Sequence, residues 1–264
     1  MSMLKVENLN IKVHDKKSTG TIISDVDFEM EKGDIFGIVG ESGSGKTMTA
    51  LAIAGLLSRH DMEKRGTIIF EGVNLLNVER KVLRKIQGNE IAMIFQEPLN
   101  SLNPLKKVGW QVEESLRIHT VMEKEEMKER ALKALADVEL DNPEAVYNSY
   151  PHELSGGMRQ RVMIAAAMII QPKLLIADEP TTALDVTIQA QIVELLKKLN
   201  RERQVSILFI SHDLSLVNSL CEKVIVMQNG LVVEQGLCKD IFNNPQKEYT
   251  KNLIGSIPKN PFEK

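Results

Sequence analysis

A glycine-rich loop between an apolar run and a helical segment constrains this chain most. The run Ile35–Val39 is short and apolar, which is typical of a strand buried on both faces of a parallel sheet. It is followed by Gly40-Glu41-Ser42-Gly43-Ser44-Gly45-Lys46-Thr47, which fits the pattern G-x-x-x-x-G-K-[ST]. A helix is predicted over Thr47–Leu57. A strand, such a loop and a helix, in this order, predict a binding site for phosphate.

The residue types in the loop suit a nucleotide. Glycines let backbone N–H groups converge on phosphate oxygens. Lys46 supplies a charge for the β- and γ-phosphates, and Thr47 a hydroxyl for Mg²⁺. The alternative is a Gly/Ser-rich turn with no ligand, but the flanking strand and helix favour the phosphate site. The candidate nucleotide-binding residues are Gly40, Glu41, Ser42, Gly43, Ser44, Gly45, Lys46, Thr47 and Met48.

A second candidate site follows the apolar strand predicted at Leu174–Ala177, which ends in Asp178 and Glu179. Hard cations such as Mg²⁺ prefer oxygen ligands, so Asp178 suits the metal and Glu179 suits activation of water. Acidic strand ends are also common helix caps. The phosphate loop upstream favours the catalytic interpretation.

Composition excludes several classes. The 264 residues are 43% hydrophobic, enough for one large domain or a domain with a subdomain. The net charge of −3 gives no basic field, so no nucleic-acid partner is predicted. Cys221 and Cys238 match no metal or redox spacing and are interpreted as buried or incidental thiols. No signal pattern occurs at Met1–Asn10, and the apolar run Val162–Ile170 is too short to span a bilayer. We therefore expect a chain that is soluble by itself.

Strands and helices alternate along most of the chain, which implies a mostly parallel sheet covered on both faces. Val26, Phe28 and Met30 alternate with acidic residues, as in a half-buried strand. Asn229-Gly230 favours a tight hairpin turn. The other predicted elements are strands at Thr67–Phe70 and Val205–Ile210, helices from Ser155 to about Ile170 and over Thr187–Leu199, and hairpin strands at Lys223–Met227 and Leu231–Glu234.

The section from about Pro98 to Ser149 differs in character. Met127, Ala131 and Leu135 fall at helical spacing with charged residues between them, and Val138 continues the pattern. The section is predicted to be a separate helical subdomain, and the alternative is an amphipathic surface helix.

Four further motifs resemble one family, the ATP-binding subunits of ABC transporters. Leu154–Arg161 resembles the family signature, with Met158 where glutamine is commonest. Gln96 resembles the glutamine that links the nucleotide core to the helical subdomain. Thr182-Ala183-Leu184-Asp185 resembles the loop that crosses the dimer interface, and His212 the switch histidine that senses the γ-phosphate. Read alone, Ser155 is an N-cap and His212 a loop histidine.

The resemblance implies an α/β fold: a P-loop NTPase domain of the ABC type with a mostly parallel sheet core, an N-terminal antiparallel β subdomain and an inserted α-helical subdomain. It implies a single ABC ATPase domain over 1–264. Its nucleotide-binding core would comprise 1–97 and 155–235, its helical subdomain 98–154 and its C-terminal family extension 236–264.

The resemblance also implies a mechanism in which ATP and Mg²⁺ lie between two subunits that face head to tail. One subunit gives the catalytic residues Lys46, Gln96, Glu179 and His212, and the metal ligands Thr47, Gln96 and Asp178. The other gives the nucleotide-binding residues Ser155, Gly156 and Gly157. Asp185, in the interface loop, is a further nucleotide-binding candidate. Many relatives stack an aromatic ring on adenine. The stretch Asn10–His14 has none, and Val13 or His14 is left for that role.

More detailed resemblance indicates which branch of the ABC transporter family this chain is most similar to. Phe95–Pro104 and the tail Asn244–Thr250, with Lys-Glu in place of His-Pro, are similar to importers of oligopeptides, dipeptides and nickel. The chain lacks the cysteine cluster of longer peptide-importer subunits, as nickel-branch subunits often do. Peptide import is the first choice and nickel or metal-chelate import the second. The rival is an ABC ATPase of DNA repair or translation, but no coiled-coil heptads or second cassette are found.

The implied partners are two integral membrane permease subunits, a second ABC ATPase more often a paralogue than a copy, and indirectly an extracytoplasmic binding protein. Residues near Leu105–Leu116 are the candidate membrane-partner contacts. The implied location is the cytoplasmic face of the cell membrane, as a peripheral subunit.

Overall fold

The protein is described here by a computed structural model, which covers residues 2–15, 18–57, 61–96 and 101–256. These residues fall into two compact units. The first unit comprises Met1–Val78 and Leu208–Lys264, and the second comprises Glu79–Ile207. The predicted division into core, helical subdomain and C-terminal extension remains a prediction.

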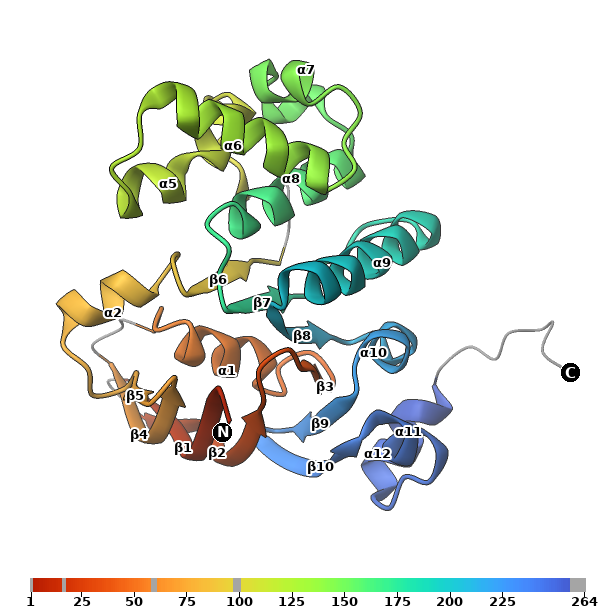
Figure 1. Cartoon of the computed structure of the whole chain (residues 1–264). Coiled ribbons are helices and arrows are strands. Elements are labelled where there is room, and N and C mark those ends of the chain that lie inside the picture. The colour runs from red at the N-terminus through yellow and green to blue at the C-terminus, as the bar shows by residue number, and fades with distance from the viewer. Residues whose placement is uncertain (1, 16–17, 58–60, 97–100, 257–264) are drawn as a thin grey trace, which may run out of the picture. The chain divides into compact units, whose positions relative to one another are not determined.

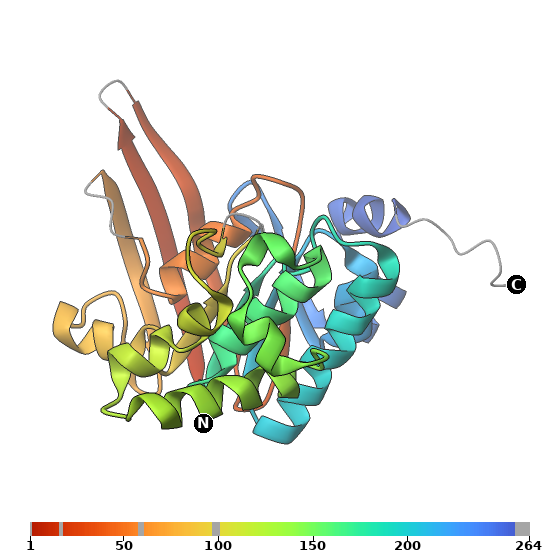
Figure 2. The ribbon, with the colours of Figure 1, turned by 90° about the horizontal axis from the view of Figure 1, so that it is seen from above.

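An antiparallel sheet forms the first part of unit one. Its order is β2 (Ser18–Met30), β1 (Leu4–Asp15), β4 (Met62–Phe70) and β5 (Val73–Asn74). Figure 2 shows these strands side by side. On β2, Val26 and Met30 are fully buried while Asp27 and Glu29 are exposed, so the predicted alternation is confirmed. This sheet matches the predicted N-terminal antiparallel β subdomain.

In unit one, β3 (Ile35–Val39) pairs in parallel with β9 (Lys223–Gln228). β9 continues into β10 (Leu231–Leu237) through a tight turn in which Asn229 and Gly230 both have positive φ, 49° and 82°. The predicted hairpin is therefore confirmed. The helices of this unit are α1 (Lys46–Ile53), α10 (Leu214–Leu220), α11 (Cys238–Asn243) and α12 (Glu248–Gly255).

Unit two pairs β6 (Ile91–Ile94) in parallel with β7 (Leu174–Asp178). β8 (Ser206–Ser211) begins in this unit and ends in unit one. Figure 1 shows α5, α6 and α7 gathered beside α8. The helices are α2 (Arg80–Ile86), α4 (Val108–Val112), α5 (Glu114–His119), α6 (Lys124–Asp137), α7 (Pro143–Asn148), α8 (Gly156–Met168) and α9 (Val186–Arg203), with a 3₁₀ turn at Pro151–Glu153.

Burial explains why these segments fold as they do. Every residue of β7 is buried, as a strand of a covered parallel sheet requires. On α6, Ala131 and Leu135 are fully buried, and α6 packs against α7 and α8. The helical spacing in this section therefore marks the core of a helical cluster. Among the described residues, no helix combines the length and the apolar character needed to cross a membrane.

The helix after the glycine-rich loop ends earlier than the predicted Leu57. It stops at Ile53 because Gly55 adopts φ 68°. The amide of Leu56 then donates to the carbonyl of Leu51 at 2.8 Å, as in a Schellman motif. The glycine is a helix stop that the sequence-based boundary overlooked.

Gly109 offers a test of packing in the helical cluster. A Cβ atom at this α4 position would lie 2.3 Å from ring carbons of Tyr147. We expect Gly109→Ala to lower the free energy of unfolding by about 1–3 kcal/mol, because the ring has to move. Gly20→Ala is the matched control, since a Cβ there meets nothing within 4 Å. Urea unfolding of both variants checks this, and equal midpoints would contradict it.

Candidate active site

The glycine-rich loop of unit one connects the end of β3 to the first residue of α1. It packs tightly on its own unit, since a Cβ atom at Gly40 would lie only 2.2 Å from the carbonyl oxygen of Met227. The amide of Gly230, in the β9–β10 turn, donates to the carbonyl of Ser44 at 3.0 Å. The predicted strand–loop–helix order is therefore present, and the hairpin turn supports the loop.

Two polar side chains of the loop are buried. Lys46 is 4% exposed, and its Nζ donates to the carbonyls of Gly40 at 2.8 Å and Glu41 at 2.9 Å. Ser44 is also 4% exposed, and its Oγ has no hydrogen-bond partner among the described residues. Buried polar atoms are normally hydrogen-bonded, so an orphaned hydroxyl beside a buried lysine fits a site for a polar, anionic ligand.

Tyr249 also contacts the loop. Its hydroxyl accepts a hydrogen bond from the Glu41 amide at 3.1 Å. The two residues are 208 positions apart, and in the sequence Tyr249 belongs only to the tail motif Asn244–Thr250. No local pattern indicates such a contact.

His212 lies directly after β8 and is exposed. In the sheet order β8 is the neighbour of β3, the strand that leads into the glycine-rich loop. The next residue, Asp213, is the N-cap of α10 and accepts from the amide of Ser215 at 2.8 Å. His212 therefore occupies a short loop between a buried strand and a capped helix, as predicted.

In unit two the parallel register brings two candidate residues together. Ile94 of β6 is paired with Ala177 of β7, and Gln96 and Glu179 each follow two residues later. Gln96 Nε2 donates to Glu179 Oε2 at 2.9 Å. Asp178, the last residue of β7, is 1% exposed. The candidate catalytic carboxylate and the candidate linking glutamine thus meet where two parallel strands end.

A strained loop holds Glu179. Its φ is 47°, and Ala183 in the same loop has φ 64°. Non-glycine residues seldom adopt positive φ, and such strain gathers at functional sites. Thr182 Oγ1 donates to Glu179 Oε2 at 3.0 Å, so one carboxylate oxygen accepts from both Gln96 and Thr182. The sequence placed Thr182 in the interface loop and did not predict this bond.

The signature segment forms the start of α8. Ser155 is its N-cap, and the Ser155 Oγ accepts from the Met158 amide at 3.3 Å. No acidic residue occupies the first turn, so no carboxylate from this turn offsets the positive end of the helix dipole. Gly156 and Gly157 open the helix, and a Cβ at Gly157 would lie 3.0 Å from Ile188. Ser155 is therefore an N-cap, as its simplest interpretation states, and Ser155 and Gly156 are both exposed at the start of the helix.

The start of α8 lies against the loop that leads into α9. A Cβ at Gly156 would lie 3.5 Å from Leu184 Cδ2. Asp185 is the N-cap of α9, and its carboxylate accepts from the Ile188 amide at 2.9 Å. The signature segment and the predicted interface loop therefore form one surface within unit two.

The signature arginines bind their own unit. Arg159 Nε donates to the carbonyl of Pro151 at 2.7 Å. Arg161 Nη1 donates to the carbonyl of Val138 at 2.6 Å, which ties α8 to the end of α6. These arginines brace the helical cluster.

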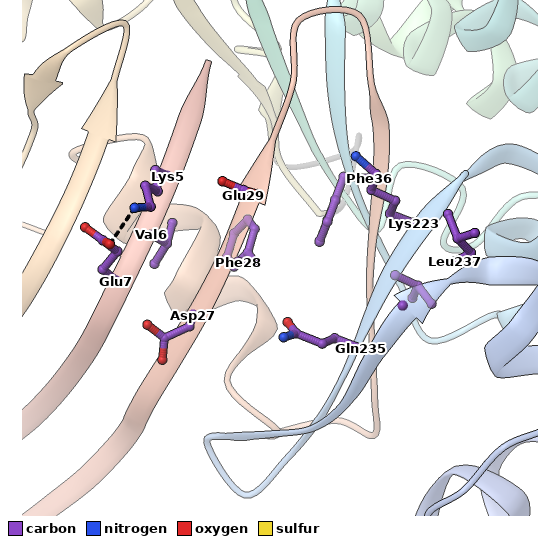
Figure 3. Close-up of a pocket in the computed structure, with 12 residues that line it drawn as sticks. Lys5, Val6, Glu7, Asp27, Phe28, Glu29, Phe36, Lys223, Gln235 and Leu237 are labelled. Carbon is purple, nitrogen blue, oxygen red and sulfur yellow. Dashed lines mark ion pairs between the residues drawn. The ribbon is translucent and has the colours of Figure 1, made fainter. Parts of the chain in front are cut away.

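Unit one holds a cavity with a volume of about 680 Å³. Figure 3 shows residues that line it. It is lined by Phe36 near the start of β3, whereas the loop follows the end of that strand. Its lining lysines have acidic partners: Lys5 pairs with Glu7 at 2.6 Å and Lys223 with Asp34 at 3.1 Å. None of the described lining residues belongs to the glycine-rich loop.

The two cysteines are buried in unit one. Burial raises the pKa of the Cys221 thiol well above its usual value and that of Cys238 to about 12, so both are unreactive buried thiols.

His14 Nε2 lies 3.1 Å from Glu63 Oε2. Assignment of an adenine contact to Val13 or His14 remains a prediction. The motif Phe95–Pro104 lies partly outside the described residues.

A phosphate loop with a buried lysine, and an amide–carboxylate pair at two parallel strand ends, define a P-loop nucleotide-binding protein of the α/β class. The family model described as ABC transporter matches residues 23–182, which is more than half of the chain. This chain belongs to the ABC transporter family, in its ATP-binding subunits.

Curated relatives and solved structures agree with this. The chain is 46% identical to a dipeptide transport ATP-binding protein of Haemophilus influenzae over 98% of this chain and 78% of the relative. It is 48% identical to an oligopeptide transport ATP-binding protein of Bacillus subtilis over 97% of this chain and 72% of the relative. The dimeric post-hydrolysis structure of an ATP-binding cassette bound to ADP and Pi matches with a TM-score of 0.80 and 29% identity, covering 89% and 99% of the two chains.

Proposed function

We propose that this chain is the ATP-hydrolysing subunit of an ABC transporter that imports peptides. The observation that carries the proposal is the similarity, over nearly the whole chain, to ATP-binding proteins of dipeptide and oligopeptide transport. The buried lysine and orphaned serine hydroxyl of the glycine-rich loop support ATP as the substrate.

In the proposed site, the β- and γ-phosphates of ATP lie on the loop amides of residues 40–48. The Nζ of Lys46 bonds two loop carbonyls, which places its positive charge within the loop. The positive end of α1 faces the same anion, since the helix begins at Lys46. The orphaned Ser44 hydroxyl is a further donor for the phosphate chain.

The residues also fit Mg²⁺. The Thr47 hydroxyl, the buried Asp178 carboxylate and the Gln96 side chain offer the oxygen ligands that hard cations prefer. The family resemblance is the reason to propose these three residues as the metal ligands. When bound, Mg²⁺ offsets negative charge on the phosphates.

Glu179 is the proposed general base that polarises the attacking water. Its Oε2 is held by Gln96 and Thr182, which fixes the direction of the carboxylate. His212, in its loop after β8, is the proposed sensor of the γ-phosphate.

A second ABC ATPase completes the site in this proposal. Its own Ser155–Gly157 segment faces the γ-phosphate with helix-start amides, and the Asp185 loop lies at the interface. The partner is more often a paralogue than a copy in this branch. The helical subdomain 98–154 passes the motion to two membrane permease subunits at the cytoplasmic face of the membrane, fed by an extracytoplasmic binding protein. Leu105, 83% exposed, and Trp110, 42% exposed, mark the proposed contact region 105–116.

Two substitutions separate binding from chemistry. We expect Glu179→Gln to keep ATP binding and to lower the hydrolysis rate of the assembled complex by about 10²–10⁴-fold, because the general base is lost. Lys46→Ala should weaken ATP binding about ten- to a hundredfold, because charge-assisted hydrogen bonds are lost. ATP binding and phosphate release measure the two effects.

The matched control for the carboxylate is Glu144→Gln, an exposed residue of the helical cluster that pairs with Lys128 at 2.8 Å. It should change neither binding nor hydrolysis. Equal ATPase rates in the wild type and in Glu179→Gln would remove Glu179 as the base.

Removal of divalent metal gives an independent test. With excess EDTA we expect ATP hydrolysis by the complex to stop, and added Mg²⁺ to restore it. Asp178→Asn should raise the Mg²⁺ concentration needed for half-maximal rate, because it removes an anionic ligand. Full activity in EDTA, or an unchanged Mg²⁺ requirement in Asp178→Asn, would contradict the assignment.

The cargo is tested on the assembled complex. We expect this chain to purify with integral membrane proteins, and its ATPase rate to rise when the binding protein is loaded with short peptides. If nickel or a metal chelate stimulates the ATPase rate instead, the complex is an importer of nickel or of a metal chelate. Enrichment with ribosomes or DNA, without membrane proteins, would overturn the transport function.

A further inference from the structure

The C-terminal segment Asn244–Thr250 reaches the phosphate loop inside unit one. The phenol oxygen of Tyr249 accepts a hydrogen bond from the Glu41 amide at 3.1 Å. This amide belongs to the peptide unit between Gly40 and Glu41, the first peptide unit of the loop. A residue of the C-terminal helix α12 therefore bonds directly to the backbone of the candidate site.

The same peptide unit is also the anchor of the site lysine. Lys46 Nζ donates to the Gly40 carbonyl at 2.8 Å, at the opposite end of that peptide plane. A peptide unit is planar, so its N–H and C=O groups turn together. Tyr249 at the N–H end thereby sets the direction of the carbonyl that Lys46 binds.

A carboxylate in β10 holds Tyr249 in place. Glu234 Oε1 accepts from the Gln246 amide at 2.8 Å, and its Oε2 from the Lys247 amide at 3.2 Å. Lys247 is the N-cap of α12, so Glu234 fixes the entry into the helix that carries Tyr249. Thr250, which follows Tyr249, is 1% exposed, and its burial holds the first turn of α12 in place.

The chemistry of the phenol suits this role. Tyr249 is partly buried, and burial raises its pKa above the ordinary value of tyrosine. The hydroxyl is neutral throughout the physiological pH range, so it adds no negative charge beside a site for polyphosphate. A carboxylate in the same place would repel that ligand.

We propose that Tyr249 is a positioning residue of the nucleotide site: it orients the Gly40–Glu41 peptide plane, and through it Lys46, while Glu234 holds Tyr249. This inference rests on the proposed phosphate role of the loop. It gives the C-terminal extension a part in ATP binding. The opposing view is that Tyr249 only fastens the C-terminal helix to the unit.

The test is Tyr249→Phe in the full chain, which removes one oxygen atom and keeps the ring. Titration calorimetry with ATP and Mg²⁺ should show about three- to tenfold weaker binding, the range that loss of one hydrogen bond produces. The exchange rate of the Glu41 amide should rise with it. Tyr147→Phe is the matched control, because it removes a phenol hydroxyl bonded to Glu113 in the other unit. It should leave ATP affinity unchanged.

A double-mutant cycle tests the second link. If Glu234 acts through Tyr249, Glu234→Ala weakens ATP binding, and combining it with Tyr249→Phe adds little further loss. Fully additive losses would show that Glu234 does not act through Tyr249.

Unchanged ATP affinity in Tyr249→Phe, with or without a lower Tm, would overturn the positioning role and leave a fastening role. Lys46→Ala keeps this result distinct from failure of the site itself. If Lys46→Ala loses ATP binding while Tyr249→Phe does not, only the present inference fails. If both bind ATP as the wild type does, the phosphate role of the loop fails as well.

Discussion

The chemistry of unit two depends on the register between β6 and β7. Parallel strands end at the same sheet edge, and pairing of Ile94 with Ala177 makes Gln96 and Glu179 neighbours. Because side chains alternate along a strand, a slip of one residue would turn one partner to the opposite face. Complete burial of β7 opposes such a slip, since side chains that pack closely on both faces would lose their fitted positions. The apolar core of the strand pair therefore determines the direction of a carboxylate at its edge.

Unit one meets a different constraint, because its loop must leave backbone amides available to a ligand. The Ser44 amide bonds the Glu41 carbonyl within the loop at 3.2 Å, and further support comes from other groups. The Gly230 amide bonds the Ser44 carbonyl, the Tyr249 hydroxyl bonds the Glu41 amide, and the Lys46 ammonium bonds two loop carbonyls. The Gly230 and Lys46 contacts use loop carbonyls, which a phosphate does not need, whereas the Tyr249 contact uses one loop amide, that of Glu41.

Local sequence patterns were enough to predict much of the fold and part of the candidate site. The strands β3 and β7 were predicted from short apolar runs, and the Asn229-Gly230 turn was predicted from its residue types. Both signals depend only on residues that are neighbours in the chain. The end of α1 was misplaced because Gly55 can stand inside a helix or end one, and only the backbone geometry shows which. Tyr249 and Thr182 escaped prediction for a further reason: their bonds depend on how folded segments meet, and no spacing encodes that.

The β9–β10 turn has a consequence for how this protein tolerates change in length. Hairpin turns at a surface commonly accept inserted residues. Here the Gly230 amide bonds Ser44, the Gly230 carbonyl accepts from the Ser24 amide at 2.9 Å, and a Cβ on Gly230 would lie 2.2 Å from the carbonyl oxygen of Ile22. The turn is thus held by contacts on both of its faces. One inserted residue would break its contact with the glycine-rich loop. Epitope tags and reporter fusions therefore belong elsewhere on this cassette, although the turn looks like an ordinary surface connection in the sequence.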